Sequence, residues 1–163
     1  AIKITKNKKI GILGTQGTVN SNAYGKELLS KVPDIEIVSK ACPLFVPLVE
    51  EGLVEGEIPS SIAGLYLKEV KSSDIDTVIL GCTHYPLLKE TIAEFLGNKI
   101  TLVDSGNAIA KAVASELHNH KLISTDKNGK IQCFVTDDSK SFDILASRFL
   151  RKNITAAQHI DIS

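Results

Sequence analysis

The sequence predicts an α/β protein whose mostly parallel sheet is flanked by helices. Short, near-continuous runs of Ile and Val recur along the chain, and strands buried on both faces of a sheet have this pattern. Stretches with helical periodicity lie between the runs, and glycine, asparagine and proline mark several boundaries. Alternating strands and helices of these lengths imply βαβ units with right-handed crossovers.

Five apolar runs are expected to form strands: Lys9 to Leu13, Ile35 to Ser39, Thr77 to Leu80, Ile100 to Val103 and Ile131 to Val135. Four stripes with helical spacing are expected to form helices: Ile62, Leu65, Tyr66 and Val70; Leu88, Ile92, Phe95 and Leu96; Ile109, Ala112, Val113 and Leu117; and Phe142, Leu145, Ala146, Phe149 and Leu150. Pro59 suits a first helical turn, and Gly97 with Asn98 suits a helix end. Ser139 or Ser141 is expected to cap the last helix.

Composition excludes several classes of protein. The chain has 163 residues, and its 19 Lys plus Arg balance 19 Asp plus Glu, so nothing suggests nucleic-acid binding. No apolar run approaches the roughly 18 residues of a spanning helix, so no membrane association is expected. Three cysteines without a dense spacing pattern indicate free thiols and a cytoplasmic protein. The chain contains no Met, and Ala1 leads directly into a segment that looks interior, so we expect a part of a longer chain.

Reactive and polar residues follow four of the expected strands. They are Gly14, Thr15, Gly17 and Thr18; Cys42; Gly81, Cys82, Thr83, His84 and Tyr85; and Asp104, Ser105 and Gly106. In a parallel sheet these four groups share the carboxyl edge, where ligands of α/β proteins collect.

The segment from Gly14 to Thr18 is either a tight strand-to-helix turn or an anion-binding loop. It lacks the GxGxxG register and a P-loop lysine, and Thr15 and Thr18 suit a carboxylate better than a triphosphate.

Cys82 is the leading candidate for a chemically active side chain. It directly follows a buried strand and precedes the helix that Tyr85 and Pro86 open, and a position near a helix N-terminus favours the thiolate. His84 adds a group that exchanges protons near neutral pH. The alternative is that Cys82 is a small buried hydrophobe.

For the other cysteines and histidines, the surrounding sequence favours structural roles. Cys42 has apolar neighbours that raise a thiol pKa, and Cys133 lies in an expected core strand. His118 and His120 do not share a helix face, so a metal site is not expected. Glu50 and Glu51 either form a solvated helix end or orient His84.

Several motifs together resemble bacterial glutamate racemases of the cofactor-independent aspartate/glutamate racemase family. The matching segments are Gly81-Cys82-Thr83-His84-Tyr85-Pro86-Leu87-Leu88, Gly14-Thr15 with Thr18, Ala41-Cys42-Pro43 through Glu51-Gly52, Val103-Asp104-Ser105-Gly106, and Phe134-Val135-Thr136-Asp137-Asp138. They follow the family's order and approximate spacing over nearly the whole chain, and His84 favours glutamate over aspartate.

The resemblance implies a chemistry and a set of roles. Two thiols, one on each face of glutamate, would exchange the α-proton without a cofactor and supply D-glutamate for peptidoglycan, cell wall and cell shape. By resemblance Cys82 and His84 are catalytic, Thr15, Thr18 and Thr83 bind substrate, and Glu51 supports His84. No metal or cofactor is implied, and a homodimer is left open.

The sequence departs from the family in one major respect. The family's other catalytic cysteine lies in a Cys-Asn-Thr motif of an N-terminal half that also carries Asp-Ser-Gly-x-Gly-Gly and Pro-Tyr-Gly, and this chain has none of the three. We therefore expect a C-terminal part that is inactive alone and needs the missing N-terminal half or a complementary chain. Residues 1–103 would form the second α/β racemase domain, and residues 104–163 would complete the first.

Three other functions remain open. The chain could be a non-catalytic carboxylate-binding or regulatory module built on Thr15, Thr18 and Thr83. A thiol hydrolase would need an oxyanion hole that the sequence does not identify. An NAD-binding half-domain would need a different glycine register and an acidic residue after the second strand.

Overall fold

The structure is a computed structural model that describes residues 1–126 and 128–162. The chain divides into two compact units, Ala1–Ser115 and Glu116–Ser163.

The first unit contains a four-stranded parallel sheet, as the sequence predicts. Its strands are β1 (Lys9–Gly14), β2 (Glu36–Ala41), β3 (Thr77–Leu80) and β4 (Thr101–Asp104), in the order β2-β1-β3-β4. Gly14 pairs with Ala41, Leu13 with Leu80, and Leu80 with Asp104, so the four strands end at nearly the same level. The residues that follow each strand therefore gather along one edge.

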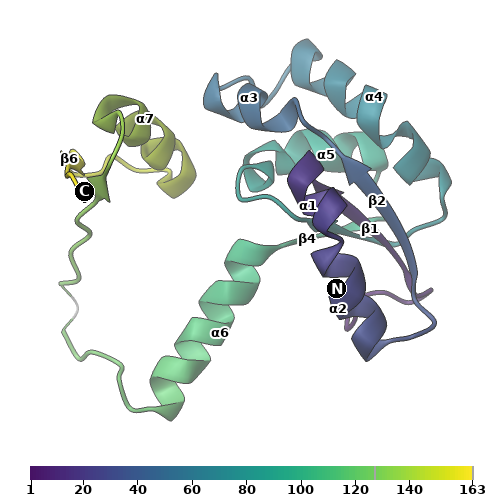
Figure 1. The fold of residues 1–163 in the computed structure, drawn as a ribbon, viewed down its shortest axis with the longest axis horizontal. Helices are drawn as coiled ribbons and strands as arrows, with labels where there is room; N and C mark the ends of the chain where they lie inside the picture. The colour runs from purple at the N-terminus through teal and green to yellow at the C-terminus, as the bar shows by residue number, and fades with distance from the viewer. Residues whose placement is uncertain (127, 163) are drawn as a thin grey trace. The chain divides into compact units, whose positions relative to one another are not determined.

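Helices cover both faces of this sheet. They are α1 (Gln16–Ser21), α2 (Ala23–Lys31), α3 (Phe45–Glu50), α4 (Glu57–Ser72), the 3-10 helix η1 (Tyr85–Leu88) and α5 (Lys89–Leu96). Figure 1 shows α3, α4 and α5 on one side of the sheet and α2 on the other. This is the arrangement that right-handed crossovers impose when the chain steps first to one side of β1 and then to the other.

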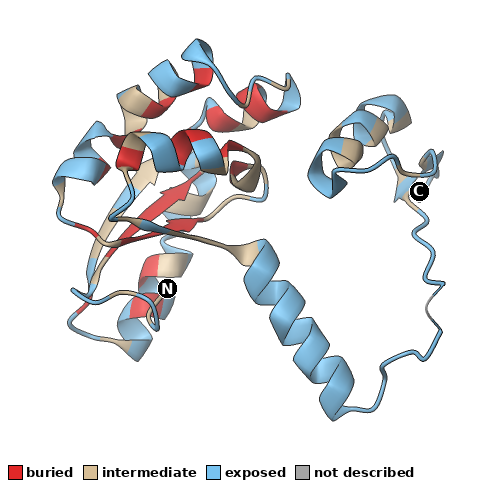
Figure 2. Ribbon diagram, turned by 180° about the vertical axis from the view of Figure 1, so that it is seen from behind, coloured by how far each residue is buried: buried red, intermediate tan, exposed pale blue. Residues whose placement is uncertain are grey.

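The core lies between the sheet and these helices. β3 is buried at all four positions and β1 at five of six, which accounts for their unbroken apolar sequences. Figure 2 shows the buried residues concentrated on the strands and on the inner sides of the helices. In α4 the buried stripe is Ala63, Leu67 and Val70, whereas Leu65 of the predicted stripe is 69% exposed. The predicted helix is confirmed, but its buried face is rotated relative to the predicted stripe.

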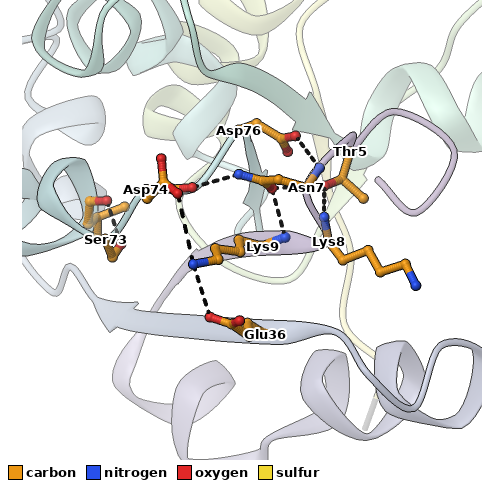
Figure 3. Close-up of polar contacts among 9 residues, drawn as sticks. Thr5, Asn7, Lys8, Lys9, Glu36, Ser73, Asp74 and Asp76 are labelled. Atoms are coloured by element: carbon orange, nitrogen blue, oxygen red, sulfur yellow. Dashed lines mark hydrogen bonds and ion pairs between the residues drawn. The ribbon is translucent and has the colours of Figure 1, made fainter.

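A polar network fixes the segment that leads into β1 (Figure 3). The backbone N–H groups of Lys6 and Asn7 donate to Asp76 Oδ2 at 2.6 and 3.0 Å, and the Asn7 side chain donates to the carbonyl of Asp74. Partial burial would raise the pKa of Asp76, but hydrogen bonds from Thr5, Lys6, Asn7 and Thr77 hold it at about 2. An ionised carboxylate therefore lies at the edge where the strands begin, opposite to the edge where they end.

Helix α6 (Ser105–Asn119) follows β4, and the second unit contains β5 (Phe134–Val135), α7 (Ser139–Leu150) and β6 (Gln158–His159). β5 pairs with β6 in parallel as a separate two-stranded sheet, so the expected strand from Ile131 is only two residues long. Asp138, and not Ser139 or Ser141, caps α7, because its carboxylate accepts from the N–H groups of Lys140 and Ser141.

Beyond Asp104 no described residue is buried, as the exposed α6 in Figure 2 illustrates. Within the described residues, no helix has the length and apolar character needed to cross a membrane.

Candidate functional site

The carboxyl edge of the sheet brings the predicted site residues onto adjacent strand ends. Backbone pairing continues one residue beyond the strands: Cys42 N–H donates to the Gly14 carbonyl at 2.9 Å, and Gly81 N–H donates to the Leu13 carbonyl at 2.7 Å. These bonds hold the loops after β1, β2 and β3 against one another, which places the threonine turn beside the cysteine loop.

The turn after β1 is organised by two threonines. Thr15 is the N-cap of α1, its Oγ1 accepts from Thr18 N–H at 3.2 Å, and the two hydroxyl oxygens are 3.0 Å apart. Both residues are half-buried. A pair of adjacent hydroxyls beside free helix N–H groups is suited to an anionic oxygen such as that of a carboxylate.

The loop after β3 places a thiol beside an imidazole. Cys82 is half-buried, and its Sγ is 4.0 Å from His84 Nδ1. The other ring nitrogen of His84, Nε2, is 3.5 Å from Glu50 Oε1. A thiol, an imidazole and a carboxylate thus follow one another, an order that orients the ring and allows a proton to pass between sulfur and nitrogen. Thr83 is exposed, and its Oγ1 is 3.4 Å from the same Nδ1.

Glu50 and Glu51 differ in what they face. Glu50, the last residue of α3, provides the carboxylate next to His84. Glu51, to which the resemblance assigned this contact, lines a small apolar hollow with Leu53 and Ile58. One step along a helix rotates a side chain by about 100°, which accounts for the different surroundings of Glu50 and the C-cap residue Glu51.

Beneath this loop lies an aromatic cluster that sequence reasoning did not single out. Tyr85 is fully buried, and its hydroxyl donates to the Cys42 carbonyl at 2.9 Å. Phe45 packs edge-to-face against both Tyr85 and Tyr66, with ring centroids 5.2 and 5.5 Å apart. Cys42 is fully buried, and this burial raises the pKa of its thiol to about 12, in keeping with the structural role expected for it.

The remaining candidates lie elsewhere. Asp104, at the end of β4, accepts from Asn107 N–H at 3.1 Å and from Lys89 Nζ at 3.0 Å, and these bonds keep its pKa below the ordinary value. Cys133 is half-buried just before β5, so the expectation of a core position is wrong. His120 pairs with Glu116 one turn away. No group of three or more His, Cys, Asp and Glu in residues 1–126 and 128–162 could hold a metal ion.

Together, the fold and the site define a parallel α/β domain whose sheet edge carries a thiol beside an imidazole and a turn with two adjacent hydroxyl groups. The sequence profile of the Asp/Glu/Hydantoin racemase family matches residues 1–113. The chain belongs to this family.

Similar proteins extend the match over most of the chain. It is 48% identical over 145 residues to a glutamate racemase of Sulfurihydrogenibium, covering 89% of this chain and 54% of the relative. It is 40% identical over 163 residues to one of Chlorobium phaeobacteroides, covering 99% and 60%. The chain therefore spans between one half and two thirds of the length of these relatives.

Two solved structures have the same fold. A glutamate racemase of Bacillus anthracis superposes with a TM-score of 0.91 at 35% identity, covering 99% of this chain and 60% of that one. A glutamate racemase of Francisella tularensis, solved in complex with D-glutamate, gives a TM-score of 0.84 at 38% identity, covering 96% and 57%.

Proposed function

We propose that this chain supplies one of the two proton-transferring thiols of a glutamate racemase, which interconverts L- and D-glutamate without a cofactor. The alignment of Cys82, His84 and Glu50 at the end of β3 carries this proposal. Membership of the racemase family and the D-glutamate complex of a relative support glutamate as the substrate.

The chemistry requires two groups on opposite faces of the α-carbon. In one direction the Cys82 thiolate takes the α-proton, and the electron pair of the C–H bond stays on carbon, conjugated with the carboxyl group. A second thiol then donates a proton to the other face. His84 exchanges the proton of Cys82 and so resets it, while Glu50 holds the imidazole in place. Thr15, Thr18 and Thr83 bind the charged ends of glutamate.

A second thiol must come from outside the described site. Cys42 is fully buried with its pKa raised to about 12, so its position and protonation both oppose this role. We propose that the missing part is an N-terminal half or a complementary chain, with residues 1–103 as one racemase domain and residues 104–163 completing the other. A second copy of this chain is the alternative partner.

The proposed setting is the bacterial cytoplasm, where D-glutamate enters peptidoglycan synthesis. The free state of Cys42, Cys82 and Cys133 is in keeping with a reducing compartment.

The deciding experiment follows deuterium incorporation at the α-carbon of each glutamate enantiomer by NMR. Racemisation is followed by the loss of the circular dichroism signal of glutamate. We expect the chain alone to exchange the α-proton of one enantiomer without racemising it, and to racemise once the N-terminal half of the Sulfurihydrogenibium relative is added. Cys82→Ser should slow exchange by about 100-fold or more, since positioned general acids and bases contribute about 10²–10⁴-fold. Cys133→Ser is the matched control and should leave exchange unchanged.

A non-catalytic binding module is the second candidate, because the described site holds one accessible thiol at its edge. Glutamate binding with neither exchange nor racemisation, even after the N-terminal half is added, would favour that function. Racemisation by the chain alone, across a range of protein concentrations, would show that a second copy or an unrecognised group serves as the partner.

A further inference from the structure

The hydroxyl of Tyr85 occupies a junction between two loops of the site. Tyr85 begins η1, three residues after Cys82, and its own N–H turns back to the Cys82 carbonyl at 3.3 Å. Its hydroxyl reaches 43 residues back along the sequence to the Cys42 carbonyl. The side chain thus connects the loop after β3 with the loop after β2.

The Cys42 carbonyl also takes part in the turn that leads into α3. It accepts from Phe45 N–H at 3.1 Å, while Cys42 N–H is bound to the Gly14 carbonyl. α3 runs from Phe45 to Glu50, which contacts His84. The hydroxyl of Tyr85 therefore fixes the base of the helix that carries Glu50 to the base of the loop that carries Cys82 and His84.

The ring of Tyr85 strengthens this connection but does not replace it. Its edge-to-face contact with Phe45 packs η1 on α3, and the hydroxyl adds a directional bond between the two loops to the backbone bonds that already hold them to β1. Burial also raises the pKa of Tyr85 well above its ordinary value, so the hydroxyl keeps its proton at physiological pH. The protonated hydroxyl is the donor of the bond to the Cys42 carbonyl.

We propose that Tyr85 is a positioning residue, whose bond to the Cys42 carbonyl sets the contact of His84 with Glu50 and thereby the reactivity of Cys82. The inference rests on the proposed role of Cys82, but it concerns the geometry of the loop and is testable without turnover.

The test is Tyr85→Phe, which keeps the buried ring and removes the hydroxyl. The rate of Cys82 alkylation by iodoacetamide is measured against pH in the full 163-residue chain, with the modified cysteine located by peptide mass spectrometry. We expect the alkylation rate of Cys82 at pH 7 to fall about 3- to 10-fold, the scale of losing one neutral hydrogen bond. Tyr66→Phe is the matched control, because Tyr66 packs against the same Phe45 ring, and it should leave the rate unchanged.

A double-variant cycle separates positioning from general loosening. In a His84→Asn background, Tyr85→Phe should have no further effect on Cys82, since the route through the imidazole is already lost. The NMR titration of the His84 ring provides a second readout and should change in Tyr85→Phe only. An unchanged alkylation profile, an equal effect of Tyr66→Phe, or a full effect in the His84→Asn background would each overturn the inference. If glutamate exchange is absent while the Tyr85 effect is present, the proposed function fails and the positioning role stands.

Discussion

At the scale of single residues, the site depends on contacts that neighbours in sequence cannot share. Glu50 lies 3.5 Å from the His84 ring, whereas Glu51 lines an apolar hollow, so two identical neighbouring side chains have different surroundings. Cys82 and Cys42 both follow strands. Cys82 is half-buried beside a histidine, whereas Cys42 is fully buried and its carbonyl accepts from the Tyr85 hydroxyl. Chemical identity selects the candidates, and the position of the backbone decides which of them can act.

The chemical identity of the candidates could be predicted from the sequence, whereas the position of the backbone around them could not. Cys82, His84 and the two threonines could be selected because their residue types and their place after apolar runs are visible in the sequence. Tyr85 also stands in the polar group after β3, but its positioning role could not be predicted, because its partner is a backbone carbonyl of a distant loop and has no sequence signature. The choice between Glu50 and Glu51 likewise needs the rotation of α3, which the apolar pattern around it does not specify.

Asp76 should make stability depend on acid pH. Its pKa is about 2 in the folded chain, against an ordinary value of 3.8, so its ionised form stabilises the fold. That stabilisation is fully present above pH about 4 and is lost as the pH falls through about 2. We expect Asp76→Asn to lower the melting temperature by about 2–4 °C at pH 7, the equivalent of about 1 kcal/mol in a chain of this size, and to flatten its pH dependence between 4 and 2. Thermal unfolding followed by circular dichroism measures both.

Asp74→Asn is the control for Asp76. The Asp74 carboxylate is 87% exposed and lies 3.9 Å from Lys9, whereas its carbonyl, which the substitution retains, accepts from Asn7. An exposed ion pair contributes little, so the melting temperature should not change by a measurable amount. Equal shifts for the two variants would contradict the role assigned to Asp76.

At the scale of elements, the strands were easier to predict than the helix faces and ends. β1 and β3 are buried on both sides, so their apolar runs mark them almost completely. The start of a helix instead depends on individual capping hydrogen bonds. Asp138 caps α7, and the two nearby serines do not, because its carboxylate accepts from two N–H groups. β5 is shorter than its apolar run, and it pairs with β6 over only two residues.

Gly81 shows how closely the element ends must approach each other. A Cβ at this position would lie 3.0 Å from the Leu13 carbonyl oxygen and 3.1 Å from the Tyr24 ring, and the carbonyl belongs to a strand that cannot easily move. We expect Gly81→Ala to lower the free energy of unfolding by about 1–3 kcal/mol, as overpacking does, and to displace the Cys82 loop. Urea unfolding measures the first effect.

Gly17→Ala provides the comparison for Gly81. Gly17 lies in α1, and an added Cβ would meet Thr15 Oγ1 at 3.9 Å, an ordinary contact. Alanine is also the better helix former, so stability should stay the same or rise slightly. A loss as large as that of Gly81→Ala would contradict the explanation by close approach at Gly81.

At the scale of the whole molecule, burial is distributed very unevenly. All the buried residues lie at or before Leu96, in the first unit, and no described residue from Ser105 onward is buried. Instead α6 and α7 present exposed apolar side chains, among them Ile109, Val113, Ile144 and Phe149. Apolar surface of this extent is typical of a face that another part of a protein covers.

The stability of the isolated chain should therefore reside almost entirely in its first unit. Truncation after Ser115 keeps β4, its Asp104 cap of α6 and the Lys89 ion pair, and it removes no buried residue. We expect the truncated chain to unfold cooperatively with a melting temperature within about 2 °C of the full chain, because buried apolar area is the dominant source of stability. In hydrogen exchange on the full chain, amides of β1 and β3 should be protected far longer than those of α7. A clear fall in the melting temperature on truncation, or equal protection of α7, would show that the second unit already has its partner within this chain.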